Sequence, residues 1–142
     1  GNMINEAKHL IPEGKFYNKD AENLDFEDGL FDRVLCYSIF HYFPSLDYAL
    51  NSLEEMVRVC KKGGILLIGD ILDKKYEEEI KRNSDLEYEK KIPSIQRYSE
   101  WMFYDLKQLS KTFQGYGYRV EILTQPSHFK CSYYRRDLRI SK

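Results

Sequence analysis

Hydrophobic positions form their clearest pattern between residues 20 and 71. From 46 to 60, apolar side chains recur every three or four residues, which places them on one face of a helix. The runs 32–37 and 65–68 contain consecutive apolar residues, as expected of parallel strands that are buried on both faces. A strand, a helix and a second strand in this order predict a right-handed β-α-β crossover.

Further elements of both kinds flank this crossover. Apolar spacing predicts helices over 3–11 and 105–113, and imperfect alternation predicts a short strand over 15–21. Alternation over 118–124 and the run 130–140 predict two final strands that pair antiparallel. The expected fold class is therefore α/β with a mixed sheet.

One charge-dense segment interrupts the apolar pattern, between residues 73 and 91. Opposite charges stand four residues apart, as in Glu77 with Lys81 and Glu87 with Lys91, which predicts a solvated helix. Two interpretations of this helix stay open. It is either an exposed surface helix or a mobile cover over a cleft.

Composition narrows the classes of function. The 142 residues suffice for one domain, 1–142, and 22 basic residues against 23 acidic residues create no field that would attract nucleic acid or a membrane. No apolar run approaches the ~18 residues of a membrane span, and no secretory signal is recognisable. Cys36, Cys60 and Cys131 are expected to be reduced, buried thiols rather than metal ligands. The prediction is a cytoplasmic protein that binds a small molecule or another protein.

Three short motifs carry a resemblance to a known family. DAENL at 20–24, FEDGLFD at 26–32 and RVCKKGG at 58–64 resemble successive motifs of class I S-adenosylmethionine-dependent methyltransferases. Asp25 and Lys62 stand where that family commonly has proline. The resemblance implies a Rossmann-like sheet, S-adenosylmethionine as the cofactor, and methyl transfer to an oxygen, nitrogen or carbon nucleophile of a small molecule.

The resemblance also implies which residues bind the cofactor. Asp20, with Ala21 and Glu22 in the same motif, would meet the adenine, and Tyr37 and Ser38 would line the methionine end. These positions agree with the rule that ligands of open α/β sheets bind outside the carboxyl ends of the strands. For Asp20 the alternative is a helix or turn cap.

His41 is the candidate catalytic residue, because it matches a position that often faces the substrate in the family. A neutral imidazole there can take a proton from the attacking atom. The alternative is packing beside Tyr42 and Phe43. Methyl transfer depends mainly on alignment of the reactants, so no catalytic triad is required.

The family's glycine-rich loop precedes the part that matches 3–11, and none of the eight glycines forms G-x-G-x-x-G after a strand. The chain thus resembles about the last three quarters of a methyltransferase, with the first β-α-β unit missing and activity impaired. The apolar edge of 31–37 would then be unpaired. Either 15–21 pairs with it, or two chains associate through it as a dimer.

Two other functions stay open. The chain is alternatively a non-catalytic, methyltransferase-derived domain that acts in protein interaction or self-association. Contact of RNA with the basic tail 129–142 is the weaker option, because nucleic acid is not expected as a partner of so balanced a chain.

Overall fold

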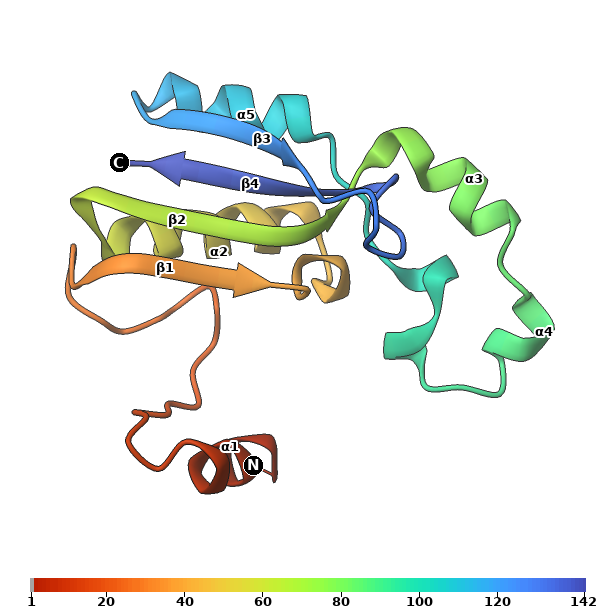
Figure 1. Cartoon of the computed structure of the whole chain (residues 1–142), viewed down its shortest axis with the longest axis horizontal. Helices are drawn as coiled ribbons and strands as arrows, with labels where there is room; N and C mark the ends of the chain where they lie inside the picture. Colours follow the sequence, from red (N-terminus) through yellow and green to blue (C-terminus); the bar gives the residue numbers. More distant parts are fainter. Residues whose placement is uncertain (1) are drawn as a thin grey trace.

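The structure, a computed structural model, describes residues 2–142 as a four-stranded sheet whose long helices lie on one face (Figure 1). In chain order the elements are α1 (Asn2–Leu10), β1 (Phe31–Tyr37), η1 (Phe40–Tyr42), α2 (Leu46–Val59), β2 (Cys60–Leu72), η2 (Lys74–Tyr76), α3 (Glu77–Arg82), α4 (Leu86–Glu89), η3 (Ser94–Gln96), η4 (Tyr98–Glu100), α5 (Leu106–Gly115), β3 (Arg119–Thr124) and β4 (Arg135–Ser141).

The sheet has the strand order β1-β2-β4-β3. β1 and β2 are parallel and are joined by α2, which confirms the predicted crossover. β4 lies between β2 and β3 and is antiparallel to both, with Ile68 opposite Leu138. The α/β class, the mixed sheet and the antiparallel C-terminal pair are therefore confirmed.

The core lies between the sheet and the helices α2 and α5. α2 begins after Ser45, whose hydroxyl oxygen accepts the backbone N–H of Tyr48 at 3.1 Å. The stripe of apolar residues along α2 faces inward, and α5 adds a second stripe beside it. Leu53, Ile68, Ile71 and Leu138 are fully buried members of this core, and Leu66, Phe113 and Ile140 are 1% exposed.

The opposite face of the sheet is largely uncovered, which corrects the expectation that 32–37 is buried on both faces. On β1, Leu35 is 68% exposed and Tyr37 is 50% exposed. Val34 and Cys36 point the other way and pack against the core. Among the described residues, β1 pairs on one side only, with β2.

The predicted strand over 15–21 is wrong, and this segment does not pair with β1. It is irregular apart from one bridge between Asp20 and Asn23. The backbone N–H of Leu24 instead donates to Glu55 on α2, at 3.1 Å. This part of the chain thus hydrogen-bonds to a helix and leaves the β1 edge open.

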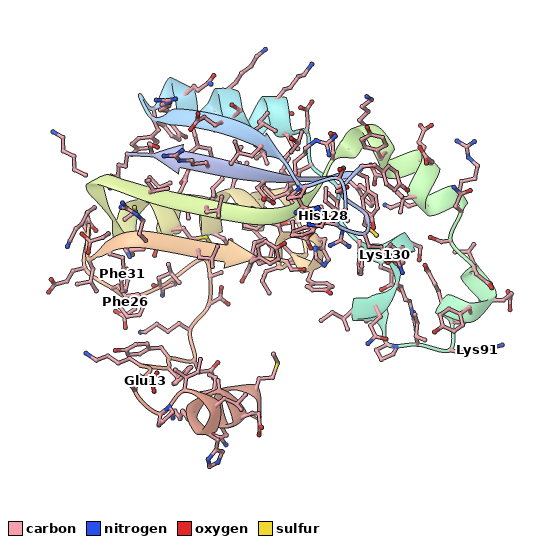
Figure 2. All side chains as sticks on the ribbon, viewed as in Figure 1. Glu13, Phe26, Phe31, Lys91, His128 and Lys130 are labelled. Atoms are coloured by element: carbon pink, nitrogen blue, oxygen red, sulfur yellow. The ribbon has the colours of Figure 1, made fainter. Side chains whose placement is uncertain are left out.

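Helix α1 confirms the predicted N-terminal helix but lies apart from the sheet (Figure 1). Its Met3 is 87% exposed. Figure 2 shows Glu13 on this outlying part, while Phe26 and Phe31 lie together at the amino end of β1. The rings of Phe26 and Phe31 meet edge to face, with centroids 5.2 Å apart.

The charge-dense segment forms η2, α3 and α4 instead of the single helix that was predicted. The Asp85 side chain accepts the N–H of Tyr88 at 3.0 Å and so starts a new helix. The Glu77–Lys81 ion pair is present at 2.7 Å. Over 130–140 only the second half is a strand, because residues 131–134 form a turn before β4.

Candidate functional site

Near the carboxyl end of each of the parallel strands β1 and β2, one residue has a left-handed backbone conformation. It is Ser38 directly after β1 and Asp70 within β2. Ser38 has φ 59° and Asp70 has φ 66°. Such conformations cost a non-glycine residue about 1–3 kcal/mol and concentrate at functional sites. Hydrogen bonds hold both residues here: Ser38 N–H donates to the Gly69 carbonyl at 3.1 Å, and Ser38 Oγ donates to Asp70 Oδ2 at 2.7 Å.

The C-terminal strands complete a buried polar cluster around Asp70, which is 6% exposed. Arg135 Nη1 forms an ion pair with Asp70 Oδ2. Asp137 Oδ1 accepts the Asp70 backbone N–H at 2.9 Å and Gln125 Nε2 at 2.9 Å. Sequence reasoning missed these partners, because they come from separate strands at no characteristic spacing.

Tyr37 lies across β2 beside this cluster. A Cβ on Gly69 would lie 2.2 Å from Tyr37 Cδ2, so only glycine at position 69 leaves room for the ring in this place. Burial and the negative charge of Asp70 raise the pKa of Tyr37, which keeps its hydroxyl protonated and able to donate. The structure therefore brings the predicted pair Tyr37 and Ser38 together with Asp70.

His41 lies in η1 and is only 2% exposed. Its ring packs between Tyr42 and Trp101, at centroid distances of 4.0 and 4.5 Å, and its Nδ1 is buried without a hydrogen-bond partner. Burial and the nearby Arg135 charge lower the pKa of His41 to about 4. His41 thus packs against its aromatic neighbours. Its imidazole is also neutral, and its Nδ1 accepts no hydrogen bond from the protein, which is compatible with the predicted catalytic role.

The Asp20 motif docks on α2. Asp20 Oδ1 accepts the Glu22 N–H at 3.0 Å and the Tyr48 hydroxyl at 2.8 Å, and these bonds lower the pKa of Asp20. Glu22 Oε1 accepts Asn51 Nδ2 at 2.9 Å. Asp20 therefore acts as a turn cap and is also exposed, while Ala21 is partly buried. Binding of a cofactor by these residues stays a prediction.

The predicted site residues fall into two groups beside the start of α2. Within residues 2–142, no hydrogen bond or ion pair joins Asp20 directly to Ser38 or His41. An aromatic contact links the groups, since the Tyr48 ring packs on Phe43 at a centroid distance of 4.8 Å. A ligand that contacts both groups would therefore have to bridge them, from the exposed Asp20 to the buried His41.

Two cavities adjoin this region. The smaller, of about 290 Å³, is lined in part by His41, Ile95 and Trp101. The larger, of about 660 Å³, lies between the start of α2, α3 and the start of α5. The described part of the chain has no cluster of three or more metal-ligating side chains and no helix that is long and apolar enough to cross a membrane.

Sequence comparison relates the first half of the chain to methyltransferases. Residues 1–68 match the family described as "Methyltransferase domain". Phthiotriol/phenolphthiotriol dimycocerosates methyltransferase 1 of Mycobacterium ulcerans is 39% identical over 71 residues, which are 50% of this chain and 25% of that protein. The probable methyltransferase ltbC of Aspergillus luteorubrus is 40% identical over 55 residues, 39% of this chain and 19% of that protein. The matches thus span a quarter or less of these relatives.

Solved structures share the fold over nearly the whole chain. A protein of Pyrococcus horikoshii superposes with a TM-score of 0.70 and 18% identity, over 99% of this chain and 66% of that one. A methyltransferase of Thermotoga maritima, described as a possible histamine N-methyltransferase, gives a TM-score of 0.59 and 20% identity, over 96% of this chain and 69% of that one. At these identities the likeness concerns the fold alone.

Proposed function

We propose that this chain, a member of the class I S-adenosylmethionine-dependent methyltransferases, binds S-adenosylmethionine and a small-molecule acceptor at the carboxyl ends of β1 and β2. One observation carries the proposal: Ser38 and Asp70 both have left-handed backbone and share a 2.7 Å hydrogen bond. Strain of this kind, at the edge where ligands of open α/β sheets bind, favours a ligand site over simple packing.

The donors and acceptors present fit this cofactor. Asp20 is an exposed carboxylate with a lowered pKa, so it can accept a hydrogen bond from the adenine amino group while Ala21 lies beside it. Tyr37 keeps a protonated hydroxyl that can donate to the methionine carboxylate, next to Ser38. Glu22 anchors the loop to α2. When bound, S-adenosylmethionine supplies an electrophilic methyl group on a positively charged sulfur.

His41 is proposed to receive the proton from an attacking oxygen or nitrogen of the acceptor. Its Nδ1 has no protein partner, and its lowered pKa keeps the imidazole neutral. Access would be through the cavity of about 290 Å³ that His41 lines. A carbon acceptor would need no such proton acceptor at the moment of attack.

The cytoplasm is the proposed location, because Cys36, Cys60 and Cys131 are all free thiols. Burial raises the pKa of Cys36 to about 11, so that thiol is protonated and unreactive at neutral pH. The three cysteines are therefore explained by packing.

Calorimetric titration with S-adenosylmethionine tests the proposed cofactor site. We expect weak binding by these 142 residues, since none of their glycines forms the family's G-x-G-x-x-G loop. Asp20→Ala should weaken binding by about tenfold or more, because a hydrogen bond to a charged group is lost.

Tyr48→Phe is the matched control. It removes the internal hydrogen bond to Asp20 but leaves the carboxylate available, so binding should stay near the wild-type value. If the wild-type chain releases no heat at millimolar ligand, the cofactor claim is wrong for this chain. If both variants bind as the wild type does, Asp20 is a turn cap only.

A second candidate function is self-association through β1. Within the described residues, this strand has an unpaired edge, and Leu35 on the open face of the sheet is 68% exposed. Unpaired backbone groups along an apolar edge strand are a template for pairing with another chain. The occupant we propose is a second copy, whose β1 would lie antiparallel to the first.

Leu35→Lys should convert the resulting dimer to a monomer, because a charge on the interface disfavours pairing. Size-exclusion chromatography with light scattering measures the mass directly. Leu10→Lys is the matched control, since Leu10 is 73% exposed on the outlying α1. A wild-type chain that elutes as a single monomeric species would rule this function out.

A further inference from the structure

Arg135, the first residue of β4, connects the buried polar cluster to the candidate proton acceptor. Its guanidinium forms the ion pair with Asp70, which also accepts the Ser38 hydroxyl at 2.7 Å. The guanidinium carbon lies 5.8 Å from the centre of the Trp101 ring, within the range of a cation–π contact. Trp101 in turn packs on His41 at a centroid distance of 4.5 Å. A continuous series of contacts therefore runs from Ser38 to His41.

The contacts of Arg135 and Trp101 leave both side chains little freedom. The Arg135 side chain is 14% exposed, and its guanidinium carbon also lies 5.3 Å from the centre of the Tyr134 ring. Trp101 is 8% exposed, and its indole N–H donates to the carbonyl oxygen of Ile95 at 2.9 Å. The positive charge of Arg135 is therefore held in a fixed place beside the ring that contacts His41.

The charged groups around His41 come from three elements. Burial is the largest cause of the lowered pKa of His41, and the charge of Arg135 on β4 adds to it, while Asp70 on β2 opposes both. Glu100 of η4 lines the smaller cavity together with His41, but it is paired with Arg97 at 2.9 Å. Arg135 thus acts on His41 in the same direction as burial, which an arginine that only stabilises the fold would not need to do.

We propose that Arg135 is a positioning residue: anchored by Asp70, it holds the Trp101 ring against His41 and keeps the imidazole uncharged. The inference rests on the function proposed above and adds to it a residue that acts through another residue and does not touch the acceptor. An imidazole that already carries a second proton cannot take one from an attacking oxygen or nitrogen. Arg135 therefore keeps His41 in the protonation state that the proposed reaction needs.

Nuclear magnetic resonance of the histidine rings, recorded as a function of pH, tests this role without any ligand. In the wild-type chain the pKa of His41 should be about 4. Arg135→Met removes the charge and keeps much of the side chain's length, so the pKa of His41 should rise by about one unit. Arg135→Lys restores a positive charge, so the pKa should stay close to the wild-type value. A purely structural arginine would lower the stability of Arg135→Met without moving the titration of His41, and that result would overturn the proposal.

Arg136→Met is the matched control. Arg136 is the next residue of β4, but its guanidinium donates to backbone carbonyl oxygens and its guanidinium carbon lies 6.0 Å from the centre of the Tyr76 ring. The titration of His41 should therefore be the same as in the wild type, and the exposed His128 serves as an internal reference. An equal rise of the His41 pKa in both arginine variants would reveal a general effect of charge and overturn the proposal.

Two measurements on the wild-type chain make the test independent of the folding of Arg135→Met, which leaves Asp70 without its cation. Nuclear Overhauser contacts should join the ring protons of Trp101 and His41, because the two rings pack together. If these contacts are absent, or if His41 titrates at or above the ordinary pH of 6.5, the proposal is wrong whatever the variants do.

The cofactor titration separates this inference from the function on which it rests. If the chain releases no heat with S-adenosylmethionine and Arg135→Met alone raises the pKa of His41, the effect of Arg135 on His41 stands and its part in methyl transfer is defeated. If the chain binds the cofactor and the pKa of His41 does not move, this inference is overturned and the proposed function stands.

Discussion

Asp70→Ala is expected to lower the free energy of unfolding by about 3–5 kcal/mol, the usual effect of removing one partner from a buried ion pair. The Asp70 and Arg135 side chains are 8% and 14% exposed, so the guanidinium would be left with an uncompensated charge. Ser38 Oγ would also lose its acceptor. The loss should appear as a lower denaturant midpoint, followed by the fluorescence of Trp101.

The control is an Asp–Arg pair at the surface. Asp28 bonds to Arg58 at 2.7 Å, and its side chain is 81% exposed. Asp28→Ala should therefore change the free energy of unfolding by less than about 1 kcal/mol. If Asp70→Ala costs no more than Asp28→Ala, the polar cluster does not stabilise the carboxyl ends of β1 and β2, and its strained backbone no longer favours a ligand site there.

His41 should make stability depend on pH in the acidic range. Its pKa is about 4 in the folded chain, below the ordinary 6.5, because burial disfavours the imidazolium. Between these values the unfolded chain binds more protons, so stability is full above pH 6.5 and falls as the pH falls toward 4. Arg135 strengthens this effect, whereas Asp70 opposes it.

The slope should reach at most about 1.4 kcal/mol per pH unit, with about 3 kcal/mol lost over the whole window. His41→Phe should flatten the curve of unfolding free energy against pH, since the ring keeps its packing on Tyr42 and Trp101. His128→Phe removes an exposed imidazole and is the matched control. Parallel curves for the wild type and His41→Phe would contradict a buried neutral histidine.

Much of the fold follows from local patterns. The helix α2 was predicted closely because its apolar stripe, its Ser45 cap and the glycines that follow all agree. The antiparallel pair β3 and β4 follows from alternation near the C-terminus. These features depend on residues that are close together in the sequence, so the sequence alone is enough to predict them.

The incorrect predictions arise where residues far apart in the sequence make contacts that override the local pattern. Residues 15–21 have a weak strand pattern, but Asp20 accepts a hydrogen bond from Tyr48 and Leu24 N–H donates to Glu55, both on α2, and strand pairing does not form. The sequence of β1 predicts a strand that is buried on both faces, yet nothing among the described residues covers Leu35. Periodicity reports which residues can be buried and does not say whether a covering layer is present.

By itself the sequence determined the crossover, the order of its motifs and their resemblance to methyltransferases, because these depend on residue types at short spacing. It also picked out Ser38 and His41, but it did not supply their surroundings. Only the tertiary structure decided that Asp70, Arg135 and Asp137 meet behind Ser38 and that His41 is buried without a partner for Nδ1. The reason is physical: hydrogen bonds and desolvation at this site join residues up to 67 positions apart, and only packing of the sheet brings them within reach.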